Sequence, residues 1–376
     1  MSAPDTAAAV FSAGVICVLY VLFGYPLLLA WRARRSPRPL LRKSQPRSVS
    51  VILPVRNGER WIDAKLRSLL ALKYPRELME ILVISDGSTD GTTGIARGFQ
   101  SEGVEVIECP ARGKAATLNA GIARARGEIL FLTDIRQPVD PDALDRLVAC
   151  FADPAVGVAS GELIILEGNG REEADVGLYW KYEKWIRRRQ SLVDSVIGAT
   201  GAIYAMRREL AVALPEDTLL DDVHLPLAAF FRGYRVVFEE TALAFDNPAA
   251  LEAEFRRKVR TLAGNYQLLV RFPQLLGPAN RMWFHFVSHK LGRLMLPFAL
   301  LAVAASSFWL PGFWKWPALA GQTLFYWLAA ADRTVGDRSP LKRISSPVRT
   351  FVVLMGAALC AVSFFFVPAR RLWKSD

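Results

Sequence analysis

The sequence predicts an α/β fold with a doubly wound, mostly parallel sheet, preceded and followed in the chain by transmembrane helices. Three observations predict it. Apolar runs of strand length alternate with helical patterns between residues 48 and 133. The uncharged run Ala8–Trp31 comes before them, and the chain is strongly apolar again from about Leu294. At 52% hydrophobic residues, the composition fits one soluble domain combined with several membrane spans.

The soluble part alternates strands and helices in a fixed order. Expected strands are Val49–Val55, Glu80–Ser85, Val104–Glu108 and Glu128–Thr133, separated by helices at Glu59–Leu72, Thr89–Gln100 and Lys114–Arg126. Apolar strands alternating with helices indicate a parallel sheet buried on both faces. Ligands of such sheets bind beyond the carboxyl ends of the strands. We therefore expect the site among Pro54–Glu59, Asp86–Asp90 and Asp134–Arg136.

The first apolar run is long enough to cross a bilayer as a helix. It has no basic residues before it and no obvious cleavage site after it, which favours an anchor over a signal peptide; a buried core helix is the alternative. Three further spans are expected in the tail, at Leu294–Leu310, Phe313–Ala331 and Phe351–Val367. The predicted division is an N-terminal span at 8–31, a basic linker at 32–47, the soluble domain at 48–270, an interfacial amphipathic segment at 271–293 and about three C-terminal spans within 294–367.

The net charge of +11 is concentrated directly after the first span. The basic residues there are Arg32, Arg34, Arg35, Arg38, Arg42, Lys43 and Arg47, with no acid among them. Such a cluster follows the positive-inside rule and favours contact with anionic lipid, rather than nucleic acid, with the soluble domain in the cytoplasm. With three tail spans, Arg370, Arg371 and Lys374 would lie outside, against the positive-inside rule. Either one tail segment is re-entrant or interfacial, or the rest of the chain sets the orientation despite this short basic loop.

Common catalytic and cofactor motifs are missing from the sequence. Cys17, Cys109, Cys150 and Cys360 are scattered, which predicts neither a metal nor a disulfide framework. There is no GxGxxG, and Arg112–Ala115 lacks the first glycine and the Ser or Thr of a phosphate loop. Nothing indicates a nucleophile paired with one of the three histidines.

Carboxylates near strand ends are the remaining chemical groups. Asp86 lies in a turn, where it serves either as a helix cap or as a ligand of a base or ribose. Asp134 follows an apolar strand, where an unpaired charge would be costly, so a functional role is favoured. Asp221 and Asp222 are adjacent like charges between apolar residues. Their repulsion favours proton uptake by one of them, which suits a general base; a solvated turn is the alternative.

Seven short motifs in this order resemble those of membrane-embedded family 2 glycosyltransferases, the relatives of hyaluronan, chitin and cellulose synthases. The motifs span Ser50–Glu59, Val83–Asp90, Gly113–Gly121, Leu132–Arg136, Gly198–Arg208, Leu219–Val223 and Arg257–Thr261. The resemblance covers about Ser48 to Gln267, and the flanking spans match it.

The resemblance implies a GT-A fold and an inverting transfer of sugar from a nucleotide sugar, most often a UDP-sugar. It implies that Asp222 is the base and Asp221 its neighbour in the site. Donor-binding residues would be Pro54, Glu59, Asp86, Lys114, Asp134, Arg136, Arg257 and Arg260. Acceptor-binding residues would be Gly201 and Ala202. Trp180 and Trp185 are further candidates, as a platform on which the acceptor sugar stacks. The alternative is that the helix carrying them lies on the membrane interface.

Two departures from the family pattern change the expectations. Arg136 stands where the second metal-binding acid of an Asp-x-Asp motif is expected, which leaves Asp134 as the motif's one ligand for Mg²⁺ or Mn²⁺. A guanidinium cannot bind a metal ion but can neutralise a diphosphate, so we expect weak or absent metal dependence. Thr261 stands where processive synthases carry a Trp, which leaves two acceptors open, a growing polysaccharide or a lipid carrier that receives one sugar.

The sequence therefore predicts a multi-pass protein of a bacterial inner membrane with a cytoplasmic catalytic domain. Its partners would be a nucleotide sugar, the bilayer and the acceptor, with a homo-oligomer as one arrangement. A catalytically inactive nucleotide-sugar-binding scaffold is the alternative from another class, and the retention of Asp134 and Asp222 speaks against it. A transporter is disfavoured because no ionisable residue lies in the middle of a tail span.

Overall fold

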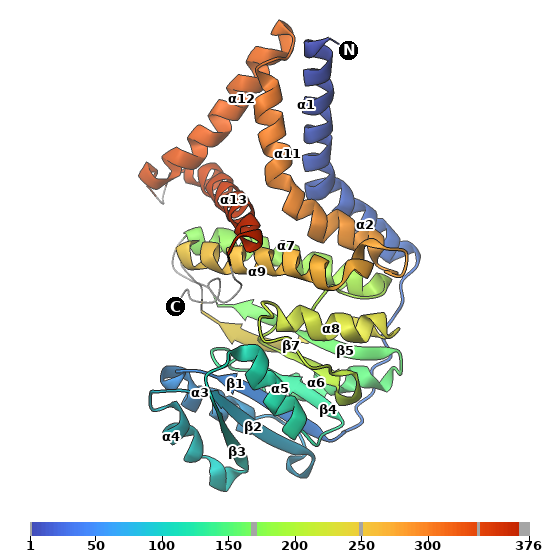
Figure 1. Ribbon diagram of the computed structural model, residues 1–376, viewed down its shortest axis with the longest axis vertical. Coiled ribbons are helices and arrows are strands. Elements are labelled where there is room, and N and C mark those ends of the chain that lie inside the picture. The colour runs from blue at the N-terminus through green and yellow to red at the C-terminus, as the bar shows by residue number, and fades with distance from the viewer. Residues whose placement is uncertain (1, 167–170, 248–250, 337–338, 368–376) are drawn as a thin grey trace. The chain divides into compact units, whose positions relative to one another are not determined.

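The computed structural model describes residues 2–166, 171–247, 251–336 and 339–367 (Figure 1). The chain divides into two compact units. One, the sheet unit, comprises Arg35–Leu166 and Arg187–Asn247. The other, the helical unit, comprises Met1–Arg34, Glu167–Ile186 and Pro248–Asp376. Each is described by itself.

The sheet unit contains one seven-stranded sheet in the order β3-β2-β1-β4-β6-β5-β7. Its strands are β1 (Val49–Val55), β2 (Met79–Asp86), β3 (Val104–Cys109), β4 (Ile129–Leu132), β5 (Val156–Ile165), β6 (Tyr204–Arg207) and β7 (Arg235–Asp246). Strands β1 to β4 run parallel to one another, and β5 runs parallel to β7. Only β6 is antiparallel to its neighbours β4 and β5. The predicted doubly wound, mostly parallel sheet is confirmed.

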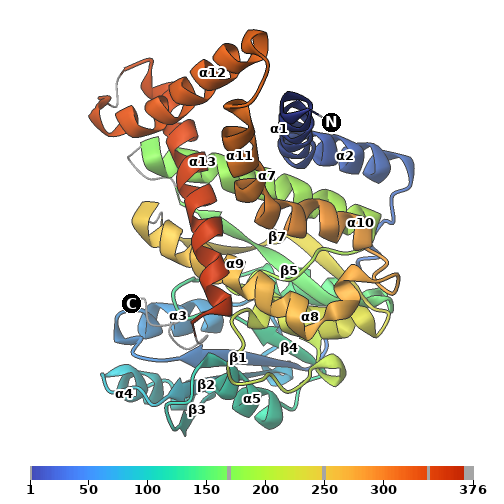
Figure 2. The same cartoon turned by 45° about the horizontal axis from the view of Figure 1, so that its top comes forward.

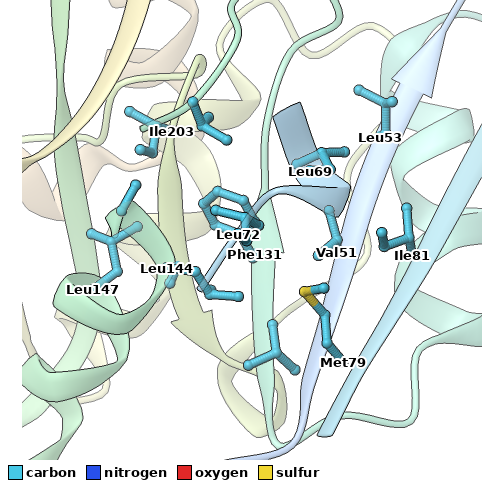
Figure 3. Close-up of a cluster of buried hydrophobic side chains, with 14 of the residues drawn as sticks. Val51, Leu53, Leu69, Leu72, Met79, Ile81, Phe131, Leu144, Leu147 and Ile203 are labelled. Carbon is cyan, nitrogen blue, oxygen red and sulfur yellow. The ribbon is translucent and has the colours of Figure 1, made fainter. Parts of the chain in front are cut away.

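Helices of the sheet unit pack on both faces of the sheet. They are α3 (Glu59–Leu70), α4 (Thr92–Arg97), α5 (Lys114–Arg124), α6 (Ala143–Ala149) and α8 (Asp221–Phe231). Figure 3 shows one face, where side chains of β1, β2 and β4 meet those of α3 and α6 in a buried cluster. On the other face, a Cβ added at Gly121 of α5 would lie 2.8 Å from both Ile52 and Ile84. All seven residues of β1 are buried, as a strand covered on both faces requires.

The last three strands were not predicted, because their sequences lack a clear alternation with helices. Strand β5 is built from VGVASGELII and β7 from RVVFEETALAFD, both with polar residues inside the run. The side chain of Glu239, within β7, is buried against Arg42 of the linker. A charge that is paired in three dimensions interrupts the apolar pattern by which a strand is recognised.

The basic linker is bound to the sheet unit through part of its charge. Arg38 pairs with Asp194 at 2.9 Å and Arg42 with Glu239 at 2.6 Å, and Arg47 pairs with Glu128. Backbone hydrogen bonds add to this, from Arg38 N–H to Leu192 and from Lys43 N–H to Ala149. Arg38, Arg42 and Arg47 therefore pair with acids of the domain, and these pairs join residues far apart in the sequence. The predicted contact of the linker with anionic lipid stays a prediction.

The described residues of the helical unit are mainly helical (Figures 1 and 2). They are α1 (Ala3–Leu19), α2 (Tyr25–Arg35), α7 (Arg171–Val193), α9 (Leu251–Arg271), α10 (Trp283–His285), α11 (Gly292–Ser307), α12 (Gly312–Ala331) and α13 (Lys342–Cys360). α7 and α2 extend beyond this unit into the sheet unit's ranges. Short π-helical segments, Tyr20–Gly24 and Phe286–Leu291, join α1 to α2 and α10 to α11. Helices α1 and α11 lie side by side, with Gly14 against Val303.

Three helices of the described residues are long and apolar enough to cross a membrane, namely Ala3–Arg35, Trp283–Ser307 and Lys342–Phe365. The first contains the predicted span at 8–31. The second begins earlier than the predicted Leu294 and includes His289 and Arg293, whose side chains meet Glu183 of α7. α12, predicted to span, is not one of the three, so its crossing stays a prediction.

Candidate active site

Three carboxylates converge at the carboxyl edge of the sheet. Asp134 follows β4, and Asp221 and Asp222 open α8. The side chain of Lys114, the first residue of α5, links two of them. Its Nζ lies 2.8 Å from Asp134 Oδ1 and 3.2 Å from Asp221 Oδ1. Residues from three separate segments therefore form one cluster, which we call the lysine-centred acids (Asp134, Asp221 and Asp222).

Gly201 lies between Asp134 and Asp222. A Cβ added to Gly201 would lie 3.2 Å from Asp134 Oδ2 and 3.3 Å from Asp222 Oδ2. Both carboxylates therefore lie close to the same point beside Gly201. A side chain at position 201 would push them apart, which gives a physical reason for glycine here.

The segment that carries Gly201 is tied to the backbone of Asp222. Pro226 in α8 has no N–H, so the carbonyl four residues earlier lacks its helical partner. That carbonyl belongs to Asp222, and it accepts a hydrogen bond from the N–H of Ala199 at 2.7 Å. The preceding Gly198 has a φ of +91°, which favours glycine. A proline inside a helix thereby fixes the neighbouring turn.

The electrostatic environment keeps Lys114 charged. Burial alone would lower the pKa of Lys114, but Asp134 and Asp221 outweigh burial and raise it above its ordinary value. The N-terminus of α8 carries a partial positive charge that stabilises the carboxylates of Asp221 and Asp222.

A second lysine, which the sequence reading missed, supports the loop after β4. Lys65 of α3 is buried, and its Nζ donates to Thr133 Oγ1 at 2.6 Å and to the carbonyl of Gln137 at 2.5 Å. Thr133 Oγ1 donates in turn to the carbonyl of Ala202 at 2.6 Å. These bonds bracket Asp134 on both sides. Burial lowers the pKa of Lys65 to about 7.

Tyr204 is the other missed residue of the cluster. Its side chain is buried, and its hydroxyl has no hydrogen-bond partner among the described residues. Burial, together with Asp221, Asp222 and Asp134, raises the pKa of Tyr204 well above its ordinary value. The phenol therefore remains a neutral donor in the neighbourhood of three carboxylates.

The acids expected to hold the nucleotide bind backbone amides. Asp86 Oδ1 accepts from the N–H of Arg112 at 2.8 Å and of Gly113 at 3.0 Å. Glu59 Oε2 accepts from Gly91 N–H at 2.9 Å. Asp86 thus fixes the loop just before Lys114, and Glu59 fixes the loop after β2.

Other predicted donor residues are less close to the cluster. Arg136 donates to Asp246 Oδ2 at 2.8 Å, at the end of β7. Pro54 lies inside β1, opposite Ile84 of β2. Ala202, predicted on the acceptor side, is buried, and its carbonyl is taken by Thr133.

Four predicted site residues, Trp180, Trp185, Arg257 and Arg260, belong to α7 and α9 of the helical unit. Trp180 is covered by Arg257, whose guanidinium carbon lies 4.9 Å from the ring centroid, and by Lys258 at 5.2 Å. Arg257 also binds Glu254 at 2.8 Å. Trp185 and Arg260 are half-buried. Their part in binding donor or acceptor stays a prediction.

The residues around Asp134 fit an ammonium ion better than a divalent metal. Among the described residues no group of three or more His, Cys, Asp or Glu is arranged to hold a metal. Magnesium requires oxygen ligands at about 2.0–2.1 Å. Here Lys114 contacts two of the converging carboxylates, while Arg136, which replaces an expected acid, turns to Asp246.

The sheet order and the acid cluster at its carboxyl edge define a GT-A fold, the class of nucleotide-sugar-dependent transferases. Residues 50–213 match the family model for Glycosyl transferase family 2. The chain therefore carries a domain of glycosyltransferase family 2, the family that its motifs resemble.

Similar proteins agree with this assignment. The chain is 26% identical over 246 residues to a poly-beta-1,6-N-acetyl-D-glucosamine synthase of Staphylococcus aureus, covering 63% of this chain and 59% of the relative. It is 24% identical to the probable glycosyltransferase YdaM of Bacillus subtilis, covering 60% and 56% respectively. The chain thus spans less than two thirds of the length of these relatives. The solved mannosyltransferase PcManGT of Pyrobaculum calidifontis, in complex with GDP-Man and Mn²⁺, shares the fold at a TM-score of 0.69 and 22% identity, covering 98% of this chain and 100% of that one.

Proposed function

We propose that this protein transfers a sugar, with inversion, from a UDP-sugar to a growing polysaccharide or a lipid-linked acceptor at the cytoplasmic face of a membrane. The observation that carries the proposal is the position of the Asp134 and Asp222 carboxylates close to Gly201, within a family 2 domain. The acceptor hydroxyl would lie beside Asp222 and the donor diphosphate beside Asp134 and Lys114.

The reaction follows from these positions. Asp222 accepts the proton of the acceptor hydroxyl as its oxygen attacks the anomeric carbon of the donor. The bond from that carbon to the diphosphate oxygen breaks, and the nucleoside diphosphate leaves with the electron pair. Attack opposite the leaving group inverts the anomeric centre. Lys114 offsets negative charge that develops on the diphosphate.

A polysaccharide product is supported by the name of the Staphylococcus relative. Transfer of one sugar to a lipid carrier is supported by Thr261, which stands where processive synthases carry a Trp. A scaffold without activity would bind nucleotide sugar and transfer nothing. These three outcomes differ in the product.

The decisive experiment uses the full chain in lipid nanodiscs with a panel of UDP-sugars and GDP-sugars. Acceptors are a polyprenyl phosphate and an oligosaccharide, and products are measured by mass spectrometry. A ladder of products indicates a polysaccharide synthase, and a single addition indicates a lipid-carrier transferase. Nucleotide binding without any product from the whole panel would contradict the proposed activity.

The membrane topology is tested separately by cysteine labelling. Ser44 is exposed in the linker, where its hydroxyl donates to Asp145 at 3.1 Å. If the sheet unit is cytoplasmic, Ser44→Cys in intact cells is protected from an impermeant maleimide and reacts after the membrane is opened. Labelling in intact cells would place the domain on the other side.

A further inference from the structure

We propose that the Lys114 ammonium takes the place of a divalent metal ion in this site. It holds Asp134 and Asp221 together and directs its third N–H to the diphosphate of the donor. This inference rests on the proposed function, because it assumes a diphosphate ligand. It assigns to a side chain of this protein the role that a metal ion has in other enzymes.

The first argument is the position of Lys114. An ammonium carries three N–H donors. Two are accounted for by Asp134 at 2.8 Å and Asp221 at 3.2 Å, both distances of charge-assisted contacts. The Lys114 side chain is 24% exposed, so the ammonium is shielded from bulk water while one side remains open toward a ligand.

The second argument is the way in which Lys114 is fixed. It is the first residue of α5, and the residue before it, Gly113, has its N–H bound by Asp86 at 3.0 Å. Gly113 has a φ of +97°, a conformation that a side chain would strain. The backbone of Lys114 is therefore held in place at the start of α5, and its ammonium is held by Asp134 and Asp221.

The third argument is the replacement of the expected second metal ligand. Arg136 stands at that position and pairs with Asp246 at 2.8 Å. Its guanidinium is half exposed, so it remains accessible as a further cation for the diphosphate. Arg56, on the other side of the sheet edge, lies 3.8 Å from Asp86 and is also exposed. Fixed cations thus supply the positive charge that a diphosphate requires.

The test measures nucleotide and metal binding by the full chain in detergent, without relying on turnover. UDP and GDP are titrated calorimetrically in excess EDTA and in excess Mn²⁺. We expect the dissociation constants of the wild type to agree within about threefold. Binding that becomes more than about tenfold tighter with Mn²⁺ would overturn the proposal.

The variant Lys114→Met provides the converse measurement. It should weaken nucleotide binding in EDTA by about tenfold or more, because a charge-assisted contact is lost. It should also bind Mn²⁺, followed by electron paramagnetic resonance, at least about tenfold more tightly than wild type, because the ammonium that contacts Asp134 and Asp221 no longer competes with the ion. Lys114→Arg keeps the charge and is the matched control.

Equal Mn²⁺ binding by wild type and Lys114→Met would also overturn the inference. A failure of the proposed function is distinguishable, since it would appear as no UDP or GDP binding by the wild type under either condition. If Lys114→Met does not fold, the nucleotide affinities of the wild type in EDTA and in Mn²⁺ still test the inference.

Discussion

Two sets of acids at the same sheet edge are held in opposite ways. Glu59, Asp86 and Asp90 accept hydrogen bonds from backbone N–H groups, and we call them the amide-bound acids. The lysine-centred acids, defined above, surround a side-chain ammonium. An acid bound by amides is locked into its loop and shapes a binding surface. An acid that faces the Lys114 ammonium or a glycine leaves an oxygen available to a reactant.

The largest effect should come from the proposed base. Asp222→Asn preserves size but cannot accept a proton, so turnover should fall by about 10²–10⁴ while donor binding is almost unchanged. The measurements are initial rates with radiolabelled donor and calorimetric titration of UDP.

Asp221→Asn is the neighbouring control and should be milder, because Asp221 orients Lys114 rather than receiving the proton. The reverse order, with Asp221→Asn abolishing turnover and Asp222→Asn tolerated, would move the base by one residue. Normal turnover in both variants would contradict the mechanism.

A pair of glycines compares the two sets of acids directly. Gly201→Ala adds a methyl group 3.2 Å from Asp134 Oδ2 and 3.3 Å from Asp222 Oδ2. Displacing catalytic groups by a few tenths of an ångström should lower turnover by about tenfold to a hundredfold. Gly91→Ala adds its methyl 2.9 Å from the carboxylate of Glu59, an amide-bound acid that takes no part in the transfer step, so we expect little change in turnover at saturating donor. Similar losses in both variants would remove the distinction between the two sets.

The amide-bound set is tested by Asp86→Ala. It removes the acceptor of two N–H groups and the proposed ligand of the uridine, so UDP binding should weaken by about 1–3 kcal/mol. Asp86→Asn keeps one acceptor oxygen and should retain part of the affinity. Calorimetry that finds the UDP affinity of Asp86→Ala unchanged would exclude Asp86 from the nucleotide site.

The smallest effect concerns pH and Lys65, beneath the lysine-centred acids. Burial lowers the pKa of Lys65 from its ordinary value of 10.5 to about 7. Between these pH values the unfolded chain holds a proton that the folded chain releases, so folding becomes more favourable as pH rises through this window.

The Lys65→Met variant has no proton to release at this position. Its free energy of unfolding relative to that of the wild type should therefore be greatest below about pH 7. Its advantage should then shrink as pH rises, by up to about 1.4 kcal/mol per pH unit. Thermal unfolding of both proteins in detergent at about pH 6.5 and about pH 9 measures the change. A difference that does not depend on pH would mean that Lys65 keeps the same charge throughout.

Local pattern was enough to predict the first half of the sheet. Strands β1 to β4 were recognised because each is a short apolar run followed by a helical pattern. Asp86, Asp134 and Asp222 were selected because each lies near a strand end or among apolar residues. The same reasoning missed β5 to β7, whose polar residues are paired by contacts far away in the sequence.

The sequence by itself determined which residue types are present, their order, the apolar segments and the family motifs, because these depend on near neighbours in the chain. Only the tertiary structure decided their partners. It brought Lys114 between Asp134 and Asp221, placed Gly201 against two carboxylates, turned Arg136 to Asp246 and buried Lys65 behind the loop of Asp134. Charges pair over a few ångströms of space, and the sheet brings together residues that are more than one hundred positions apart.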